Sequence, residues 1–185
     1  MRTLKQILAA IVPAPFLQQL FSAYHFSLAW LAAIFYGYPA RSLLVIAVTG
    51  TKGKTSVSEM MNAILERAGH RTCLVNSIRF KLGSTSRPNL TRMSMPGRFF
   101  TQKFLYDALH AGCTSAILEV TSEGARQHRH RFLDLDALIF TNLAPEHIES
   151  HGSYEAYASA KFEIGKQLAR SEKRPRIIVA NADDK

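Results

Sequence analysis

Residue types suited to holding a polyphosphate occur together in one turn, Gly50-Thr51-Lys52-Gly53-Lys54-Thr55-Ser56. Glycines let backbone N–H groups approach phosphate oxygens, and a helix starting at Lys54 would add unpaired N–H donors and a partial positive charge. Lys54 could reach the β- and γ-phosphates, and the Thr55 hydroxyl could bind Mg²⁺. The spacing departs from the pattern G-x-x-x-x-G-K-[ST], because Val48 stands where its first glycine would fall. We predict an ATP site here, against the alternative of a glycine-rich turn with surface lysines.

The segments around this turn alternate between strand-like and helix-like patterns. The apolar run 43–48 predicts a strand buried on both faces, and 54–67 predicts a helix that ends at Gly69. The apolar face expected on that helix comprises Val57, Met60, Met61, Ile64 and Leu65. Further strands are expected at 72–75, 115–120, 138–141 and 176–180, and further helices at 99–110 and 154–169. We therefore predict an α/β fold with a mostly parallel sheet and helices on both faces.

The stretch 76–97 interrupts this alternation. It is rich in Ser, Thr, Arg, Pro and Gly and shows little periodicity. A structureless loop of this length is uncommon in a domain, so we predict either a functional loop or a small hairpin.

Composition limits the function classes without choosing among them. The chain has 185 residues, of which 47% are hydrophobic, enough for one domain with a core. Its formal net charge of +9 suits anionic partners. Because the aromatic residues lie in apolar runs and do not alternate with Lys and Arg, we expect no nucleic acid partner. Cys73 and Cys113 have no disulfide or metal-ligand spacing, so we expect buried thiols and a cytoplasmic location.

The N-terminal part, 16–38, is apolar and aromatic. Its polar interruptions argue against a membrane span: Gln18, Gln19, Ser22, His25 and Ser27. No cleavage site of a signal peptide is evident. We predict a packed or interface-lying helix within an apolar segment 1–40. The position of Trp30 and the tyrosines leaves peripheral contact with a membrane open.

The loop 49–56 resembles the phosphate loop of the Mur ligases and their folate-polyglutamating relatives. Three later blocks strengthen the resemblance: Leu118-Glu119-Val120-Thr121-Ser122-Glu123-Gly124, the segment from Phe140-Thr141-Asn142-Leu143 to His151-Gly152, and Tyr157-Ala158-Ser159-Ala160-Lys161. The final Asn181-Ala182-Asp183-Asp184 also matches the family. The resemblance extends from about Val45 to the end, and one departure is Glu123, where the family has His.

The resemblance implies roles for residues of these blocks. Glu119 would hold Mg²⁺ beside the phosphates together with Thr55. His147 and Lys161, carbamylated by CO₂, would hold a second Mg²⁺, and Asn142 would lie near the nucleotide. These enzymes join a carboxylate to an amine with ATP, through an acyl phosphate, so Lys54, Lys161 and His147 become the catalytic candidates.

The branch that adds the third amino acid to UDP-N-acetylmuramoyl-dipeptide is the most similar part of the family. Met95, Pro96, Gln127 and Arg129 fall where that branch contacts its nucleotide-sugar substrate. The family normally adds an N-terminal uridine-binding domain and a C-terminal domain that brings the amino acid. We therefore expect 41–185 to be a central ATP-binding domain, incomplete at its C-terminal end. The chain is then either a fragment of a longer, monomeric ligase, which we favour, or a reduced relative of the family.

Three alternatives stay open. A ligase like folylpolyglutamate synthase shares the loop and the chemistry. A nucleotide-binding module without ligase activity, anchored at a membrane by its first forty residues, would bind ATP without turnover. A motor or switch ATPase would need a strand ending in Asp, whereas the strand here ends in Glu119.

Overall fold

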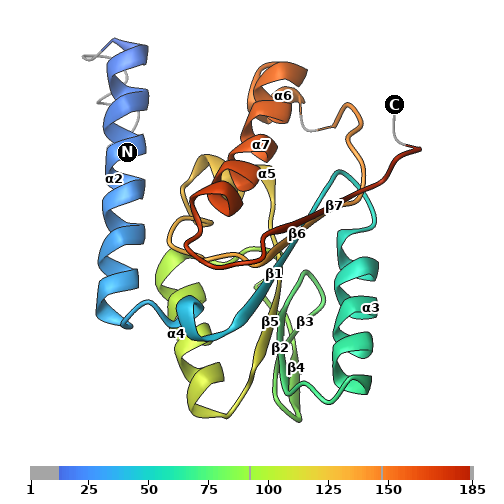
Figure 1. Ribbon diagram of the computed structural model, residues 1–185. Helices are drawn as coiled ribbons and strands as arrows, with labels where there is room; N and C mark the ends of the chain where they lie inside the picture. Colours follow the sequence, from blue (N-terminus) through green and yellow to red (C-terminus); the bar gives the residue numbers. More distant parts are fainter. Residues whose placement is uncertain (1–12, 92, 147, 184–185) are drawn as a thin grey trace.

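One sheet of seven strands forms the centre of the computed structural model, which describes residues 13–91, 93–146 and 148–183. The strand order is β4-β3-β2-β5-β1-β6-β7 (Figure 1). Strands β2, β5, β1, β6 and β7 are parallel, and β3 and β4 form an antiparallel hairpin. The strand bounds are β1 Leu44–Thr49, β2 Thr72–Val75, β3 Arg79–Leu82, β4 Thr85–Pro88, β5 Ser115–Glu119, β6 Ala137–Phe140 and β7 Ile177–Ala180. The predicted fold class is confirmed, and the stretch 76–97 contains the hairpin.

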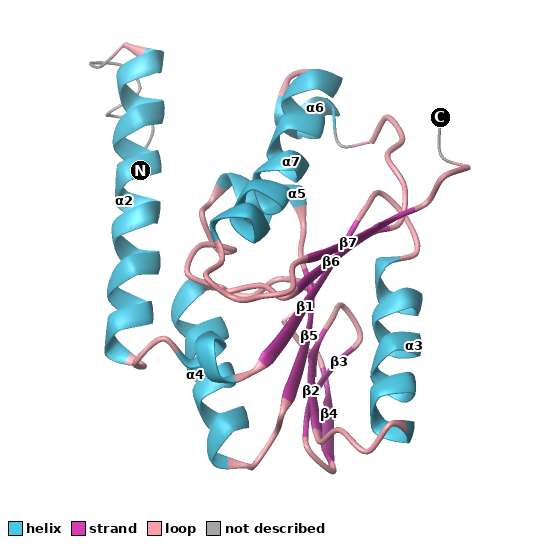
Figure 2. Cartoon of the chain, in the orientation of Figure 1, coloured by secondary structure: helices cyan, strands magenta, loops and turns pink. Residues whose placement is uncertain are grey.

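Helices cover both faces of the sheet, as Figure 2 shows. Of the helices in the described part of the chain, α3 covers one face, and α4, α5 and α7 lie on the other, with α2 outside them. The helix bounds are α2 Ala14–Phe35, α3 Lys54–Arg67, α4 Arg98–His110, α5 Ser122–Arg126, α6 Ile148–His151 and α7 Tyr154–Arg170, with a 3₁₀ turn η1 at Pro39–Ser42. The short α5 and α6 were not predicted, because four or five residues show no helical period.

Successive side chains of strand β1 point to opposite faces of the sheet, and an apolar cluster covers each face. Val45 and Ala47 join the larger core under α4 and α7, while Val48 packs with Leu74 and Ile117 beneath α3. The side chains of α3 that cover this second cluster are Val57, Met61 and Leu65. The interior therefore holds a continuous sheet between two apolar layers.

The predicted apolar face of α3 is wrong at two positions. Met60 and Ile64 are 57% and 61% exposed. The buried face turns instead toward Ser58 and Asn62, which are almost fully buried. Asn62 Oδ1 accepts a hydrogen bond from the Thr72 hydroxyl at 2.7 Å. Polar contacts with Thr72, the first residue of β2, thus fix the rotation of the helix, and a hydrophobic pattern does not reveal such contacts.

Helix α2 confirms the predicted apolar N-terminal helix. Its inner face contains Leu17, Ala29, Ala32 and Ala33, all buried, and it lies against α4. Its outer face exposes large side chains: Phe16, Leu20, Tyr24, Phe26, Trp30, Leu31, Ile34 and Phe35. Among the described residues, no helix has the length and hydropathy needed to cross a membrane. Peripheral membrane contact stays a prediction, which sedimentation with lipid vesicles would check.

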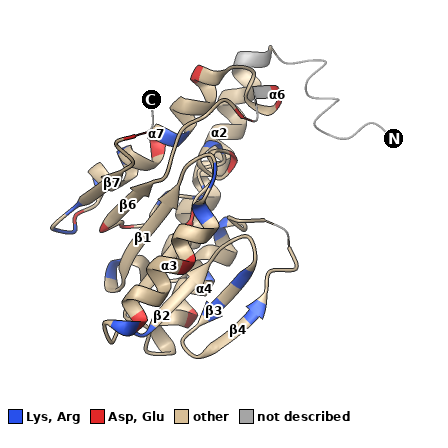
Figure 3. Cartoon of the chain, turned by 90° about the vertical axis from the view of Figure 1, so that its right-hand side faces the viewer, with Lys and Arg blue, Asp and Glu red and all other residues tan. Residues whose placement is uncertain are grey.

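Charged side chains lie mainly away from the central strands. Figure 3 shows Lys and Arg on both strands of the β3–β4 hairpin, at the outer edge of the sheet. Within this hairpin, Arg79 pairs with Glu59 of α3, with 2.5 Å between Nη2 and Oε2. The hairpin is thereby attached to the helix that follows the glycine-rich loop. Cys73 and Cys113 are both buried free thiols, as predicted.

Candidate active site

The carboxyl ends of three neighbouring parallel strands meet at one edge of the sheet. Strand β1 lies between β5 and β6 and leads into the loop 50–53. Strand β5 ends at Glu119, and β6 is followed by Thr141 and Asn142. Ligands of open parallel sheets bind outside this edge. The fold therefore gathers three of the segments identified in the sequence at the position expected for a ligand.

The loop ends in the exposed amino terminus of α3. Gly53 precedes the helix with a φ of +79°, and no side chain caps it. The first four N–H groups of an α-helix have no partner within the helix, and the helix dipole places partial positive charge there. Lys54, Thr55 and Ser56 form the first turn. This arrangement favours binding of an anion such as a phosphate group.

Gly50 fits its position because it has no side chain. Its φ is +143°, and an added Cβ would lie 1.9 Å from Thr141 Oγ1 and 3.0 Å from the Asn142 backbone nitrogen. Both neighbours belong to the segment after β6. The loop can approach that segment closely only with glycine here.

We expect Gly50→Ala to lower the free energy of unfolding by roughly 2 kcal/mol or more, through strain and the clash with Thr141. Gly53→Ala is the matched control. At Gly53 φ is also positive, but no atom lies within 4 Å of the added Cβ, so the expected cost is about 1 kcal/mol. Urea unfolding measures both values, and equal losses would contradict a packing role for Gly50.

Asn142 holds the loop in place. Its Oδ1 accepts hydrogen bonds from the backbone N–H groups of Thr51 and Lys52 at 3.1 and 2.9 Å, and its Nδ2 donates to the Lys52 carbonyl at 3.1 Å. The side chain of Thr51 is also fixed, because its hydroxyl is hydrogen-bonded to the Tyr157 hydroxyl at 2.9 Å. Two of the predicted nucleotide-binding residues thus direct their N–H groups to Asn142. The geometry gives Asn142 a role in positioning the loop.

A buried carboxylate lies directly beside the first turn of α3. Glu119 is 2% exposed, and its Oε2 accepts hydrogen bonds from the Thr55 hydroxyl at 3.0 Å and from the Ser77 backbone at 3.1 Å. The Thr55 and Ser77 hydroxyl oxygens are 2.8 Å apart. Mg²⁺ prefers hard oxygen ligands and combines one or two carboxylates with phosphate and water oxygens. The hydroxyl and carboxylate therefore fit the predicted metal.

Two lysine side chains meet at the Gly50 carbonyl. Lys54 Nζ donates to Gly50 O and Thr51 O, both at 2.9 Å, and Lys161 Nζ donates to Gly50 O at 2.6 Å. Lys161 is 2% exposed and lies 4.8 Å from the centre of the Tyr157 ring. Burial, aided by the charge of Lys54 and opposed by Glu146, lowers the pKa of Lys161 to about 7. An amine with this pKa is largely uncharged slightly above neutral pH.

His147 lies outside the described residues, so its position relative to Lys161 stays a prediction. Within the ranges 13–91, 93–146 and 148–183, no group of three or more His, Cys, Asp and Glu side chains could hold a metal ion. The predicted metal ligands include the hydroxyl of Thr55 and the modified side chain of Lys161. A cluster made of His, Cys, Asp and Glu alone would include neither of them. The loop, Glu119 and Lys161 are nevertheless brought together.

The predicted substrate contacts divide into two sets. Met95 and Pro96 are buried, and the Met95 sulfur packs so closely on Gly124 that an added Cβ there would lie 2.5 Å away. Gln127 and Arg129 are half-buried after α5, and Arg129 Nη2 donates to Gln127 Oε1 at 2.8 Å. Arg129 also donates to the Met95 carbonyl. Packing is thus the evident role of Met95, and substrate contact by all four residues stays a prediction.

Three residues of the site were missed. Ser77 follows β2, which is the neighbour of β5 in the sheet. Residues at the carboxyl ends of parallel strands lie at the ligand-binding edge, so the reasoning that identified Glu119 at the end of β5 also applies to Ser77. Tyr157 precedes Lys161 by one helical turn and so shares its face. Arg98 donates to the Gln127 carbonyl at 2.6 Å from the start of α4, and the sequence carries no signal for this long-range contact.

Comparison with known proteins identifies the family. Residues 48–185 match the model of the Mur ligase middle domain. A UDP-N-acetylmuramyl-tripeptide synthetase of Roseiflexus sp. (strain RS-1) is 37% identical over 166 residues, covering 85% of this chain and 33% of the relative. A UDP-N-acetylmuramoyl-L-alanyl-D-glutamate–2,6-diaminopimelate ligase of Listeria monocytogenes serotype 4b is 35% identical over 160 residues, covering 85% and 32%. The chain thus spans about a third of the length of these relatives.

Solved structures show the same fold. A UDP-N-acetylmuramoyl-L-alanyl-D-glutamate–2,6-diaminopimelate ligase aligns with a TM-score of 0.60 and 27% identity over 75% of this chain and 32% of its own. A folylpolyglutamate synthase of Mycobacterium tuberculosis, complexed with ADP and AMPPCP, aligns with a TM-score of 0.64 over 84% and 41%, and its 17% identity supports the fold alone. The family model covers most of the sheet and the whole glycine-rich loop after Val48. The chain therefore belongs to the Mur ligase family, through that family's middle domain.

Proposed function

We propose that this chain is the ATP-binding part of a ligase that adds an amino acid to a UDP-N-acetylmuramoyl-peptide in peptidoglycan precursor synthesis, in the cytoplasm. One observation carries the proposal most directly. The glycine-rich loop, the Thr55 hydroxyl and the buried Glu119 carboxylate form one cluster at the carboxyl edge of the sheet. The names of the relatives from Roseiflexus and Listeria favour a peptidoglycan substrate.

In the proposed reaction the substrate carboxylate attacks the γ-phosphate of ATP and releases ADP. The amine of the amino acid then displaces phosphate from the acyl phosphate, through a tetrahedral intermediate, and forms the amide. Lys54 would leave the carbonyls of Gly50 and Thr51 and neutralise charge on the transferring phosphoryl group. Bound Mg²⁺ would supply further charge neutralisation. Thr55 and Glu119 would hold one ion, and His147 and carbamylated Lys161 the second.

The assay that tests this proposal measures ADP release by the full-length enzyme with UDP-N-acetylmuramoyl-L-alanyl-D-glutamate and single amino acids. We expect turnover only when ATP, the UDP-linked peptide and one amino acid are all present. ADP release that needs neither of the other two substrates would instead indicate a nucleotide switch. Turnover with a folate in place of the UDP-linked peptide would favour the folylpolyglutamate-synthase-like alternative.

Carbamylation of Lys161 has its own expected signature. The uncharged amine reacts with CO₂, and the buried position of Lys161 at the Gly50 carbonyl protects the product from water. With its pKa at about 7, the reactive fraction rises with pH. In ¹³C NMR with labelled bicarbonate, we expect a carbamate signal that grows between about pH 6 and about pH 8.

Two variants assign this signal. Lys161→Met should remove it, and Lys166→Met should retain it, because Lys166 is an exposed lysine of the same helix, ion-paired with Glu163. A signal that persists in Lys161→Met would contradict the assignment.

A further inference from the structure

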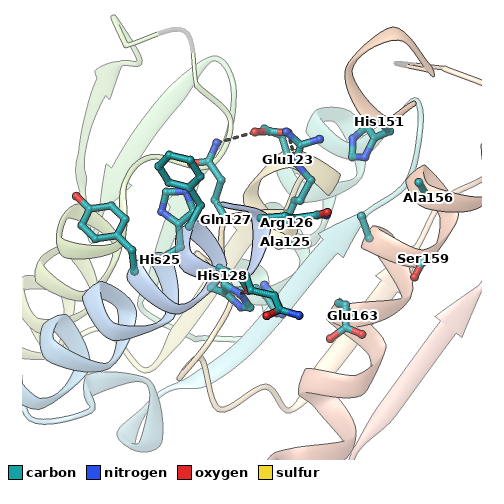
Figure 4. A pocket seen from close by; sticks show the side chains of 17 residues that line it. His25, Glu123, Ala125, Arg126, Gln127, His128, His151, Ala156, Ser159 and Glu163 are labelled. Carbon is teal, nitrogen blue, oxygen red and sulfur yellow. Dashed lines mark hydrogen bonds and ion pairs between the residues drawn. The ribbon is translucent and has the colours of Figure 1, made fainter. Parts of the chain in front are cut away.

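A second cavity lies beside the nucleotide site, between α2 on one side and α5 and α7 on the other. Its volume is about 1070 Å³, at the upper end of the range for small-molecule sites. Figure 4 shows His25 of α2 facing the residues after α5, with Ser159 and Glu163 of α7 across the space. Only two residues separate α5 from Glu119 at the end of β5. The cavity therefore adjoins the edge of the sheet where the loop lies.

Side-chain contacts hold α2 in place as one wall of this cavity. Arg98 Nη2 donates to His25 Nδ1 at 2.6 Å and to the Gln127 carbonyl at 2.6 Å, so one guanidinium joins α2 to the chain after α5. The Ser22 hydroxyl contacts His128 Nε2 at 2.8 Å. Since arginine can only donate, His25 Nδ1 must accept, and the ring hydrogen then lies on Nε2. His25 is thus prepared to donate a hydrogen bond to a ligand.

Two histidines in the lining of this cavity have buried ring nitrogens without a hydrogen-bond partner in the described part of the chain. His130 lines it and is 1% exposed, yet neither ring nitrogen has a partner within the described part of the chain. His128 also lines the cavity, and its Nδ1 is buried without a partner there. His128 also has a φ of +55°, unusual for a residue other than glycine. Most buried polar groups in proteins have a partner, so the unpaired ring nitrogens of His128 and His130 in the lining favour a ligand in this cavity.

The lining indicates the chemistry of that ligand. Amide and imidazole side chains line it, from Gln18, Gln19, His25, Gln127, His128, His130 and His151, together with the carboxylates of Glu123 and Glu163. Amide and imidazole groups both donate and accept hydrogen bonds, as hydroxyl and acetamido groups require. Tyr24 adds an aromatic side chain, and Arg126 is paired with Glu123. These features suit a sugar that carries hydroxyl and acetamido groups.

We infer that α2 forms one wall of the binding site for the glycosyl part of a UDP-sugar-peptide, with His25 and Gln18 as specificity-determining residues. The inference rests on the proposed function, and it adds α2 to the substrate site. In this arrangement the sugar lies between α2 and α5, and the peptide extends along α7 toward the phosphate loop.

Isothermal titration calorimetry with UDP-N-acetylmuramoyl-L-alanyl-D-glutamate, on the chain saturated with AMPPCP, tests this inference. We expect His25→Ala and Gln18→Ala each to weaken binding about tenfold through the loss of hydrogen bonds in the cavity. Ser27→Ala is the matched control on the same helix. The Ser27 hydroxyl is exposed and bonds only locally, to the Ala23 carbonyl, so its variant should bind as the unsubstituted chain does.

A second measurement uses the unsubstituted chain, so its result does not depend on whether the variants fold. Hydrogen exchange of the unsubstituted chain should show protection at 18–25 and 123–128 when the UDP-linked peptide is added. Three results would overturn this inference and leave the proposed function intact. They are unchanged affinity in both cavity variants, hydrogen-exchange protection confined to other segments, and no binding of the UDP-linked peptide to a chain that still binds AMPPCP. Failure to bind AMPPCP would instead overturn the proposed function on which it rests.

Discussion

Lys54→Ala should reduce ATP turnover by the full-length enzyme at least about a hundredfold, the scale typical for removing one group that stabilises transition-state charge. Lys54 Nζ donates to Gly50 O and Thr51 O, and it starts the helix whose amino end faces the phosphate site. The flexible four-carbon stem of a lysine allows its ammonium group to exchange these carbonyls for phosphate oxygens by side-chain rotation. Initial rates of ADP release, compared at saturating ATP, measure the loss.

Lys52→Ala is the matched control within the same loop. Lys52 is exposed, and its backbone, not its side chain, makes the hydrogen bonds with Asn142. We expect its alanine variant to keep turnover within about threefold, since removal of an exposed charge has a small effect. Equal losses in the two variants would mean that general positive charge matters and that the position of Lys54 does not.

Glu119→Gln should raise the Mg²⁺ concentration needed for half-maximal binding of AMPPCP by at least about tenfold. Glutamine keeps an oxygen that can accept from Thr55 and the Ser77 backbone, so the local fold should persist. It loses the negative charge that a hard cation needs. Fluorescence titration of a labelled nucleotide at several Mg²⁺ concentrations measures the change.

Glu123→Gln provides the comparison for Glu119. Glu123 lies at the start of α5 and pairs with Arg126, and its side chain is 43% exposed. We expect its variant to leave the Mg²⁺ dependence unchanged. A shift with Glu123→Gln but none with Glu119→Gln would transfer the metal site from the end of β5 to α5, and would refute the assignment of Glu119.

Local patterns predicted the elements that position the site. The buried run before the glycine-rich turn became β1. The helix 54–67 was correct at both ends, because glycines with positive φ, Gly53 and Gly69, flank it. The face of α3 was less predictable. Its rotation depends on Asn62 and Thr72, whose hydrogen bond joins two separate elements. Such contacts leave no periodic trace in the sequence.

The same distinction holds within the site. Residues at strand ends, such as Glu119, follow from sheet topology, and the structure brings Glu119 to Thr55. The contacts of Asn142 with the loop amides and of Arg98 with Gln127 did not follow from the sequence. Both cross more than 25 residues of chain, as their positions in the sequence show. Side-chain hydrogen bonds at that separation are set by packing, which no local window contains.

A crystal structure of the chain with AMPPCP and MgCl₂ tests the central claim most directly. The proposal predicts the β- and γ-phosphates on the loop 50–56, with Lys54 turned from the Gly50 carbonyl to the γ-phosphate. It also predicts a metal ion bound by Thr55 and Glu119. A nucleotide whose phosphates lay away from the amino end of α3, with Glu119 still bonded only to Thr55 and Ser77, would contradict it.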